Sequence, residues 1–270
     1  MASGRMEFHA QSIMQHTNFS FVLPNDVEME EVRDPRQYER PAKSLILLHG
    51  LTGTDTDWLF GGVAQMIAQQ YNLAVFMPTC GNLFYLDRGY PGGNCCTFIG
   101  EELPAYIRET FGFCMNREDT LIAGLSMGGY GALHTAFAWP DTFSACIALS
   151  SAIVYREIAE KGRRSDDVMP EKMVRDVFGD PDKILNSDIN LEVQVRRLLR
   201  EGKKLPELYL AIGTEDALYD RNQYFRHFLE KENISFTYEE GPGRHDWFFW
   251  NEYLDRGLKK LLKPEKDGQT

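Results

Sequence analysis

The stretch Leu121-Ile-Ala-Gly-Leu-Ser-Met-Gly-Gly-Tyr-Gly-Ala132 decides the fold of this chain. A short apolar run meets Gly124-x-Ser126-x-Gly128, and a helix-like pattern follows at once. That order predicts a strand, a sharp turn and a helix, the context in which G-x-S-x-G lifts a serine hydroxyl above the end of a parallel sheet. Glycine at 124 and 128 removes side chains that would collide in so tight a turn, and the turn requires a strained backbone at Ser126.

The motif alone does not decide the chemistry, because glycine and serine are common enough for it to arise by chance in roughly one protein in ten of this length. A phosphate-binding loop fits poorly: Ser126 interrupts G-x-G-x-x-G, and Tyr130 stands where a P-loop requires lysine. A glycine-rich turn that merely packs well stays open. The rest of the chain must therefore supply the partners that a nucleophilic serine needs.

The composition sets the class of protein. With 270 residues, 43% of them hydrophobic, the chain can bury the core of one large α/β domain or of two small ones. A net charge of −11 and a pI near 5.1 argue against a nucleic-acid partner, which would require a basic patch. No run of eighteen apolar residues is present, so no membrane span is expected.

The N-terminus and the cysteines favour a cytoplasmic protein. The first residues contain no apolar signal core; Met6 is a candidate start, which makes residues 1–5 a leader, and residues 263–270 are a polar tail. The five cysteines lack metal-ligand spacing and are odd in number, which favours reduced thiols. The pair Cys95-Cys96 is expected to be buried as small apolar side chains rather than reactive.

Strand and helix signals alternate along the chain without internal repeats. The continuous apolar run 44–49 is typical of a strand buried on both faces. Further strands are predicted at 19–23, 73–77, 121–123, 145–149, 207–212 and 235–239, and helices at 62–71, 98–111, 128–138, 219–231 and 246–262. This alternation predicts an α/β fold, with a mostly parallel sheet flanked by helices, as a single domain over residues 6–262.

The segment 150–205 breaks this alternation. It is charged, contains Pro170 and Pro181, and offers helix candidates at 171–178 and 190–201 but no clear strand. In an otherwise regular sheet, such a mainly helical, cap-like insertion most simply lies over the carboxyl ends of the strands, where ligands bind. A solvated surface excursion is the alternative.

A serine hydroxyl needs a base, and the chain has six histidines. His245 follows the last predicted strand and directly precedes a helix, so its ring can reach over the sheet edge. His49 ends a strand and is interpreted as holding the loop 50–53. The other four precede the predicted sheet or lie within helices: His9, His16, His134 and His227.

The base in turn needs an acid that holds its tautomer. Asp216 falls in the first loop beyond the strand that ends at Ile212, whereas Asp220, the alternative, suits the start of the next helix. The resulting chain order of Ser126, Asp216 and His245 is the order expected of α/β-hydrolases.

A tetrahedral oxyanion needs hydrogen-bond donors that are fixed in place. The predicted pair is the backbone N–H of Met127, at the helix N-terminus after the nucleophile, and that of Leu51, in the loop after the strand that ends at His49. Asp55 and Asp57 lie nearby without a metal-ligand pattern, so they are expected to be solvated loop carboxylates and no metal site is predicted.

Three segments together resemble a known family. They are His49-Gly-Leu-Thr-Gly53 with Trp58 downstream, Gly124–Ala132, and Gly243-Arg-His-Asp-Trp247 with Trp250. The chain resembles the esterase D group of α/β-hydrolases, and within it the tributyrin esterase (short-chain acyl esterase) branch, over roughly residues 6–262.

The resemblance implies carboxylic-ester hydrolysis through Ser126, Asp216 and His245, with Leu51 and Met127 as oxyanion donors and no cofactor. We therefore expect a serine carboxylesterase that hydrolyses short-chain acyl or aryl esters, with acetylated or feruloylated carbohydrates among its candidates. An S-formylglutathione hydrolase-like thioesterase and an acyltransferase are alternatives, and a non-catalytic binding protein is a remote one. The expected partner is a small-molecule or carbohydrate ester, and a homo-oligomer stays open.

Aromatic residues near the predicted site are candidates for binding substrate. Trp58, Tyr85 and Trp247 are the main candidates, with Phe84 and Phe248 beside them, although core packing explains each equally well. Asn82 and Asp87 could bind sugar hydroxyls, but ordinary turn roles are favoured for both.

Overall fold

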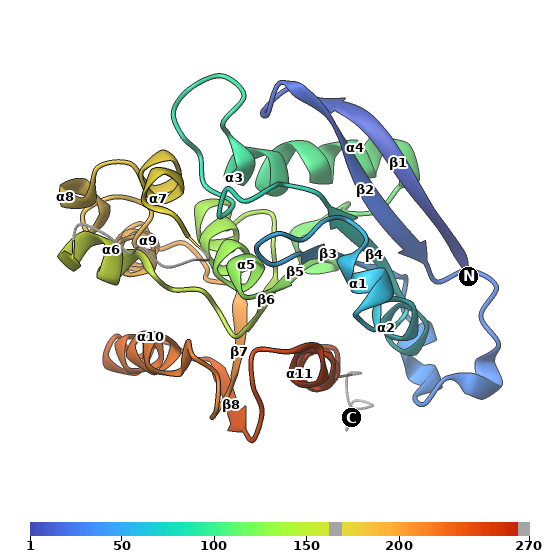
Figure 1. Cartoon of the computed structure of the whole chain (residues 1–270). Helices are drawn as coiled ribbons and strands as arrows, with labels where there is room; N and C mark the ends of the chain where they lie inside the picture. Colours follow the sequence, from blue (N-terminus) through green and yellow to red (C-terminus); the bar gives the residue numbers. More distant parts are fainter. Residues whose placement is uncertain (162–168, 264–270) are drawn as a thin grey trace.

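The computed structural model describes residues 1–161 and 169–263, and an eight-stranded sheet runs through it (Figure 1). The strand order is β1-β2-β4-β3-β5-β6-β7-β8; β2 pairs antiparallel with β1 and β4, and all other neighbours are parallel. The strands are β1 (Ala2–Ala10), β2 (Gln15–Leu23), β3 (Lys43–Leu48), β4 (Leu73–Pro78), β5 (Thr120–Leu125), β6 (Ala145–Leu149), β7 (Glu207–Gly213) and β8 (Thr237–Gly241). The predicted mostly parallel α/β sheet is confirmed.

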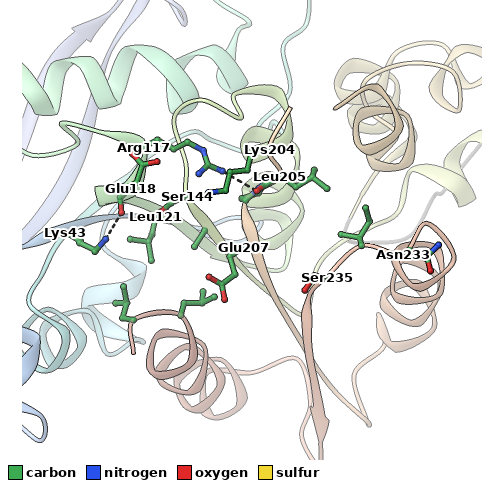
Figure 2. A pocket seen from close by; sticks show the side chains of 15 residues that line it. Lys43, Arg117, Glu118, Leu121, Ser144, Lys204, Leu205, Glu207, Asn233 and Ser235 are labelled. Atoms are coloured by element: carbon green, nitrogen blue, oxygen red, sulfur yellow. Dashed lines mark hydrogen bonds between the residues drawn. The ribbon is translucent and has the colours of Figure 1, made fainter. Parts of the chain in front are cut away.

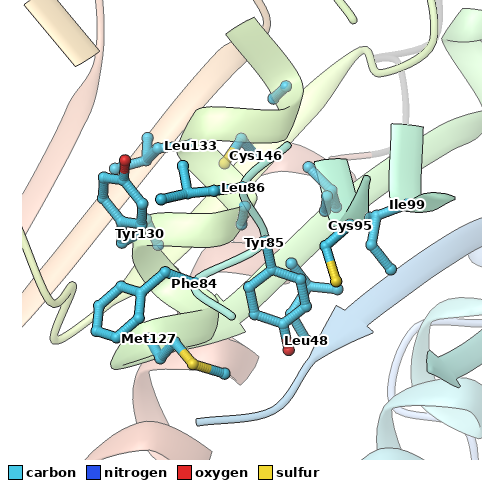
Figure 3. Packing of buried hydrophobic residues seen from close by; sticks show 14 of the residues in the cluster. Leu48, Phe84, Tyr85, Leu86, Cys95, Ile99, Met127, Tyr130, Leu133 and Cys146 are labelled. Atoms are coloured by element: carbon cyan, nitrogen blue, oxygen red, sulfur yellow. The ribbon is translucent and has the colours of Figure 1, made fainter. Parts of the chain in front are cut away.

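Helices cover both faces of this sheet. The main ones are α2 (Ala64–Tyr71) and α11 (Trp247–Leu261) on one face, and α4 (Leu103–Phe111), α5 (Met127–Ala138) and α10 (Tyr219–Lys231) on the other. Alternate strand residues feed the two cores: Leu45 and Leu47 pack with α2 and α11, whereas Ile46 and Leu48 pack toward α5. Figure 3 shows Leu48, Met127 and Tyr85 gathered beneath α5. This packing fixes the position of the β5–α5 turn.

The predicted helix 98–111 is longer than expected and contains a wide turn. Helical structure runs from α3 (Cys95–Thr97) through a π-helical segment, Phe98–Glu102, into α4. Pro104 lacks an N–H, so it cannot bond the carbonyl of Gly100 in the usual i→i−4 manner. That carbonyl accepts a hydrogen bond from the Thr142 hydroxyl instead, at 3.0 Å. The π segment therefore accommodates proline inside a continuous helix.

Residues 2–5, within the segment interpreted as a leader, are paired in the sheet. These residues form the first half of β1, with Ala2 opposite Leu23 and Arg5 opposite Ser20. This strand was not predicted, because it lies at the sheet edge and exposes alternate residues. His9 and His16, predicted to precede the sheet, lie opposite each other in this hairpin.

All regular secondary structure in the described parts of the insertion 150–205, namely 150–161 and 169–205, is helical. It contains α6 (Tyr155–Lys161), α7 (Glu171–Phe178), α8 (Pro181–Ile184) and α9 (Leu191–Arg200), and no strand. Residues 162–168 of the insertion and 264–270 of the polar tail lie outside the described residues. Among the helices of the described ranges, none is long and apolar enough to cross a bilayer.

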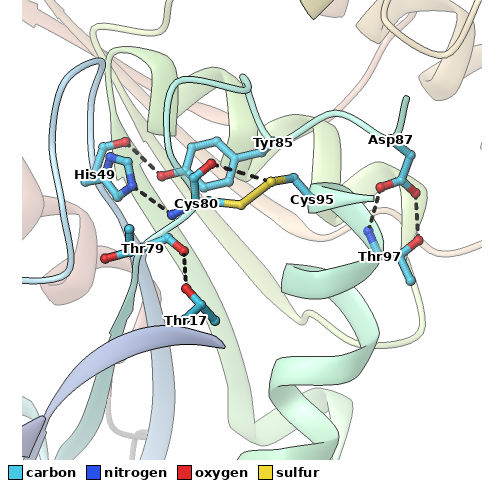
Figure 4. Close-up of a disulfide and its surroundings, with 8 residues drawn as sticks. All are labelled: Thr17, His49, Thr79, Cys80, Tyr85, Asp87, Cys95 and Thr97. Atoms are coloured by element: carbon cyan, nitrogen blue, oxygen red, sulfur yellow. Dashed lines mark hydrogen bonds between the residues drawn. A yellow bond between two sulfur atoms is a disulfide. The ribbon is translucent and has the colours of Figure 1, made fainter. Parts of the chain in front are cut away.

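The expectation of five reduced thiols is wrong, because Cys80 and Cys95 form a disulfide (Figure 4). It closes the loop that joins β4 to α3. Sequence spacing could not reveal it, because the pairing depends on the path of that loop in space. Cys96, Cys114 and Cys146 are free and buried, and the expected burial of the Cys95-Cys96 pair is confirmed.

Candidate active site

Ser126 occupies a sharp turn between β5 and α5, as the motif predicts. Its backbone has φ 54° and ψ −117°, a strained conformation for a residue with a side chain. A Cβ at Gly124 would lie 2.3 Å from the carbonyl oxygen of Gly128, and one at Gly128 would lie 2.5 Å from that of His49. Both glycines are therefore required by the close approach of three backbone segments.

The structure brings Ser126, His245 and Asp216 into one hydrogen-bonded series. His245 Nε2 lies 2.9 Å from Ser126 Oγ, and His245 Nδ1 lies 2.8 Å from Asp216 Oδ2. The three residues follow β5, β8 and β7, so they meet where the carboxyl ends of parallel strands share one edge. The Asp216 side chain is fully buried, whereas that of His245 is 35% exposed.

The environment of Asp216 favours its ionised form. Burial alone would raise the pKa of Asp216, but hydrogen bonds from His245 and from the Leu218 N–H outweigh burial and lower it. An ionised carboxylate only accepts hydrogen bonds, so Nδ1 of His245 donates and Nε2 is left to accept the serine proton. The site is thus arranged for proton transfer from Ser126 to His245.

The neighbouring acids do not compete for His245. Asp220 is exposed in the first turn of α10, the position that suits a helix-dipole role. Glu215 points to Arg244, with a 3.1 Å ion pair. Of the two candidate acids, the geometry favours Asp216.

Leu51 and Met127 lie beside Ser126 in the wall of one cavity. Met127 is the first residue of α5, so its N–H has no partner within the helix. Within the described part of the chain, neither the Leu51 nor the Met127 N–H makes a hydrogen bond. Both donors are therefore available to an oxygen atom placed above the serine.

His49 holds the loop that contains Leu51 through several contacts, and Figure 4 shows those with Cys80 and Tyr85. Its Nε2 accepts the Cys80 N–H at 3.1 Å, so Nδ1 carries the proton and donates to the Gly50 carbonyl at 2.7 Å. The Tyr85 hydroxyl donates to the His49 carbonyl at 3.0 Å. Burial lowers the pKa of His49, which favours this neutral form. The predicted structural role of His49 matches these contacts.

The cavity around Ser126 has a volume of about 540 Å³, in the range of small-molecule sites. No lysine or arginine is found among the described residues that line it. Besides the three hydrogen-bonded residues, its lining includes Gly50, Leu51, Thr52, Asp57, Phe84, Leu125, Met127, Ala152, Val154, Met169, Ala217, Leu218, Trp247 and Trp250. Val154 and Met169 show that the insertion contributes to the wall.

Two of the three predicted substrate-binding aromatics belong to the core instead. Trp58 and Tyr85 are fully buried and lie outside the cavity lining; Trp58 donates from Nε1 to the Leu48 carbonyl at 3.0 Å. Trp247 lines the cavity as predicted, and so does Phe84. The sequence could not separate these roles, because an aromatic after a strand looks the same whether it faces a cavity or a core.

Asp55 also differs from its prediction as a solvated carboxylate. Its side chain is fully buried, where it pairs with Arg5 at 2.6 Å and accepts hydrogen bonds from the hydroxyls of Ser20 and Thr79. This network connects β1, β2 and the end of β4 to the loop before α1 (Asp57–Phe60). The partner on β1 is fifty residues away, so no local sequence pattern could indicate the pair.

Asn82 and Asp87 hold other segments of the chain, rather than taking the ordinary turn roles that were favoured for them. Asn82 Oδ1 accepts the Thr52 N–H at 2.7 Å, and Asp87 accepts hydrogen bonds from the N–H and hydroxyl of Thr97. The sequence did not single out several wall residues, because they are ordinary apolar or small side chains: Ala152, Val154, Met169, Ala217 and Leu218.

A second cavity, of about 610 Å³, lies at the opposite end of the sheet (Figure 2). It is lined by residues at the amino ends of parallel strands, and two of the cations among them, Lys43 and Arg117, are engaged with backbone carbonyls. Lys43 bonds the Glu118 carbonyl, and Arg117 bonds those of Pro140 and Leu205. Within the described ranges, no three metal-ligating side chains gather at a common point. The chemistry is therefore concentrated around Ser126.

Comparisons with known proteins define first the class and then the family. The fluorophosphonate-binding serine hydrolase FphF of Staphylococcus aureus, solved with substrate bound, matches with a TM-score of 0.82 and 25% identity over 97% of this chain and 98% of that one. S-formylglutathione hydrolase (FrmB) of the same organism matches with a TM-score of 0.81 and 25% identity over 97% and 99%. The chain thus has the α/β-hydrolase fold.

The chain belongs to the family described as putative esterase, whose model matches residues 10–261. An acetyl esterase of Caldicellulosiruptor saccharolyticus is 34% identical over 264 residues, which cover 97% of this chain and 99% of the relative. The protein is therefore a carboxylic ester hydrolase, and the expectation of an enzyme rather than a non-catalytic binding protein is confirmed.

Proposed function

We propose that the protein is a serine carboxylesterase of the tributyrin-esterase branch that hydrolyses short-chain acyl esters through Ser126, His245 and Asp216. One observation carries the proposal: hydroxyl, imidazole and buried carboxylate are bonded in series, at 2.9 and 2.8 Å, within a cavity of mainly apolar lining. This arrangement supplies a nucleophile, a base and a group that orients the base.

The reaction follows as two acyl transfers. Ser126 Oγ attacks the ester carbonyl while His245 Nε2 takes its proton, and Asp216 stabilises the imidazolium that forms. The tetrahedral intermediate then expels the alcohol, which takes the proton from His245, and the acyl group stays on Ser126. Water attacks this acyl-enzyme with the same base, and the carboxylic acid leaves as Ser126 is restored.

The N–H groups of Leu51 and Met127 are the proposed oxyanion donors. Both border the cavity beside Ser126 and both are free of other hydrogen bonds in the described part of the chain. Donors fixed by backbone need no reorganisation when charge develops on the carbonyl oxygen. The contacts of His49 with the loop 50–53 support this role.

The cavity wall supports a short acyl group. Phe84, Met127, Val154 and Met169 present buried apolar side chains to it. Acetyl esters fit this description, and the acetyl esterase relative adds support. Acetylated carbohydrates are therefore the first natural candidates; feruloylated ones are the second, because a cavity of about 540 Å³ also admits an aryl group.

A thioesterase acting on S-formylglutathione is the second candidate, favoured by the likeness to the S. aureus hydrolase. The glutathione leaving group carries two carboxylates, yet the described lining of the cavity offers no lysine or arginine to pair with them. Transfer of the acyl group to an alcohol instead of water would use the same residues.

A substrate panel tests these candidates directly. Rates would be compared for p-nitrophenyl acetate, butyrate and octanoate, methyl ferulate, acetylated xylan and S-formylglutathione, and an added acceptor alcohol would reveal acyl transfer among the products. We expect the acetate and butyrate to be hydrolysed fastest. Preferred hydrolysis of S-formylglutathione would establish the thioesterase instead.

Replacement of the nucleophile tests the mechanism itself. Ser126→Ala should lower kcat by roughly 10⁴-fold or more and leave the fold intact, because alanine only removes the hydroxyl. Turnover of p-nitrophenyl acetate and a thermal melt measure the two effects. A variant that keeps full activity would remove Ser126 from the mechanism.

A further inference from the structure

The proposed mechanism indicates on which side of the cavity the alcohol part of the ester lies. His245 must protonate the leaving oxygen, so the alcohol part of the ester lies against the wall beside this imidazole. That wall contains Trp250, whose ring centroid lies 4.9 Å from that of His245, and Trp247. Asp57, the first residue of α1, lines the same cavity. The start of α11 and the helix α1 therefore flank the position of the alcohol.

These two helices are in direct contact. A Cβ at Gly61 would lie 2.4 Å from the Trp247 indole, and Asn251 Nδ2 donates to the Gly61 carbonyl at 3.0 Å. The rings of Trp58 and Trp247 meet edge to face at 5.0 Å. This contact fixes the residues on either side of it, namely Phe60 on α1 and Phe248 on α11.

Phe60 and Phe248 are exposed to an unusual degree. They are 87% and 89% exposed, more than any other large hydrophobic residue in the described part of the chain. Burial of a phenylalanine ring would stabilise the fold, yet neither ring joins a core cluster. Phe248 directly follows Trp247 of the cavity lining, and Phe60 precedes Gly61, which contacts that indole, so the two exposed rings mark a surface next to the cavity on which a ligand can pack.

Asp57 adds a polar acceptor to this rim. It is half-buried, and its Oδ1 accepts the Thr54 N–H at 3.1 Å. Within residues 1–161 and 169–263, no cation lies at ion-pair distance from Asp57, and Oδ2 makes no hydrogen bond. Oδ2 of Asp57 therefore has lone pairs free to accept hydrogen bonds from hydroxyl groups.

From this geometry we infer that Asp57, Phe60 and Phe248 form a subsite for an uncharged sugar ring on the alcohol side of the ester. The inference rests on the proposed function, because that function places the alcohol beside His245. A sugar presents both an apolar C–H face, which packs on exposed aromatic rings, and hydroxyl groups, which donate to a carboxylate. The protein is thereby assigned to esters of carbohydrates.

The same features argue against other occupants. The carboxylate of Asp57 would repel an anionic leaving group, and the net charge of −11 disfavours an anionic lipid surface. A purely apolar alcohol would leave the Asp57 oxygen desolvated without a partner, which costs free energy.

The test compares two acetyl esters that differ only in the alcohol: an acetylated xylo-oligosaccharide and p-nitrophenyl acetate. In the double variant Phe60→Ala/Phe248→Ala, kcat/KM for the oligosaccharide should fall about 10-fold further than kcat/KM for p-nitrophenyl acetate, with the change mainly in KM. Asp57→Asn should lower kcat/KM for the oligosaccharide about 5-fold further than kcat/KM for p-nitrophenyl acetate. Met115→Ala is the control, since Met115 is 53% exposed in the loop before β5, at the other end of the sheet.

A binding readout separates recognition from turnover. Unacetylated xylohexaose should inhibit hydrolysis of p-nitrophenyl acetate competitively, and the double variant should raise its inhibition constant about 10-fold. A thermal melt of each variant checks the fold, because a destabilised variant would lose activity on both esters alike.

The outcomes distinguish this inference from the proposed function. Equal losses on both esters, or no loss on either, would overturn the sugar subsite and leave the esterase standing. A loss confined to emulsified tributyrin would assign the two rings to a lipid surface and would also overturn it. A wild-type protein that fails to hydrolyse p-nitrophenyl acetate would instead sink the proposed function itself.

Discussion

At the scale of single residues, the two aspartates beyond β7 offer a matched pair. Asp216 accepts a hydrogen bond from His245, whereas Asp220 is exposed on α10. We expect Asp216→Asn to lower kcat by about 10³- to 10⁴-fold, because the amide favours the wrong imidazole tautomer. Asp220→Asn should stay within about 2-fold of the wild type. Steady-state kinetics of both variants on one ester decide the assignment. A larger loss of kcat in Asp220→Asn than in Asp216→Asn would make Asp220 the acid.

Asp55 gives a prediction on stability and pH. Burial alone would raise the pKa of Asp55, but hydrogen bonds from Arg5, Ser20 and Thr79 outweigh it and hold the pKa below its ordinary value of 3.8. A depressed folded-state pKa stabilises the fold above the unfolded pKa, and this contribution is lost as the pH falls through the folded pKa. The network should therefore support folding at neutral pH and fail in acid.

Asp55→Asn should lower the free energy of unfolding by about 2 kcal/mol at pH 7, because it removes charge-assisted hydrogen bonds from a buried site. The difference from the wild type should shrink as the pH falls below about 4. Urea unfolding at several pH values measures both effects. Asp141→Asn is the control, since Asp141 pairs with Lys203 at the exposed surface. A difference that stays constant down to pH 2 would contradict the assigned role of Asp55.

At the scale of elements, the turn between β5 and α5 depends on two backbones that nearly touch. Gly124→Ala would place a Cβ 2.3 Å from the Gly128 carbonyl oxygen, and neither backbone can yield without moving Ser126. We expect a loss of about 3 kcal/mol in stability and of most activity. Urea unfolding and p-nitrophenyl acetate turnover measure these losses.

Gly112→Ala is the control for the turn. Gly112 ends α4 at φ 72°, and a Cβ there would meet nothing within 4 Å. Gly112→Ala should therefore lower the free energy of unfolding by about 1 kcal/mol, through backbone strain alone, and the variant should keep its activity. If both alanine variants behaved alike, the close approach at the turn would have no special importance.

The elements that the sequence predicted best are those whose environment repeats locally. The strand 145–149 and the helix 219–231 were predicted with the bounds that the structure gives them, because apolar runs and helical periodicity mark buried elements directly. Strand β1 was missed, since alternate residues of this edge strand face solvent. Pairings over long distances in the chain, such as Cys80 with Cys95 or Arg5 with Asp55, leave no local pattern.

At the scale of the whole molecule, the meeting of Ser126, Asp216 and His245 could be predicted because it follows from topology. Parallel strands end at one edge, so residues that directly follow different strands come together there even when ninety residues of chain separate them. The roles of Trp58 and Tyr85 could not be predicted, because the direction in which an aromatic side chain points depends on packing between elements. The sequence thus predicted the proximity of polar groups better than the shape of the cavity.

The charge of the whole molecule gives the last prediction, which concerns substrates rather than residues. The chain carries a net charge of −11, and the described lining of the cavity contains no lysine or arginine. At an ionic strength of about 0.01 M the screening length is roughly 30 Å, so this charge repels an anionic ester as it approaches. At about 0.15 M the length falls to roughly 8 Å and the repulsion is mostly screened.

We therefore expect kcat/KM for mono-p-nitrophenyl succinate, an anionic ester, to rise about 3-fold or more between these two salt concentrations. The neutral p-nitrophenyl acetate is the matched control, and its kcat/KM should stay constant because no long-range force acts on it. Both esters release the same chromophore, so one assay measures the pair. A fall for the succinate ester with added salt would mean that a positive field guides substrates to the cavity, and the preference for uncharged esters would then have to be abandoned.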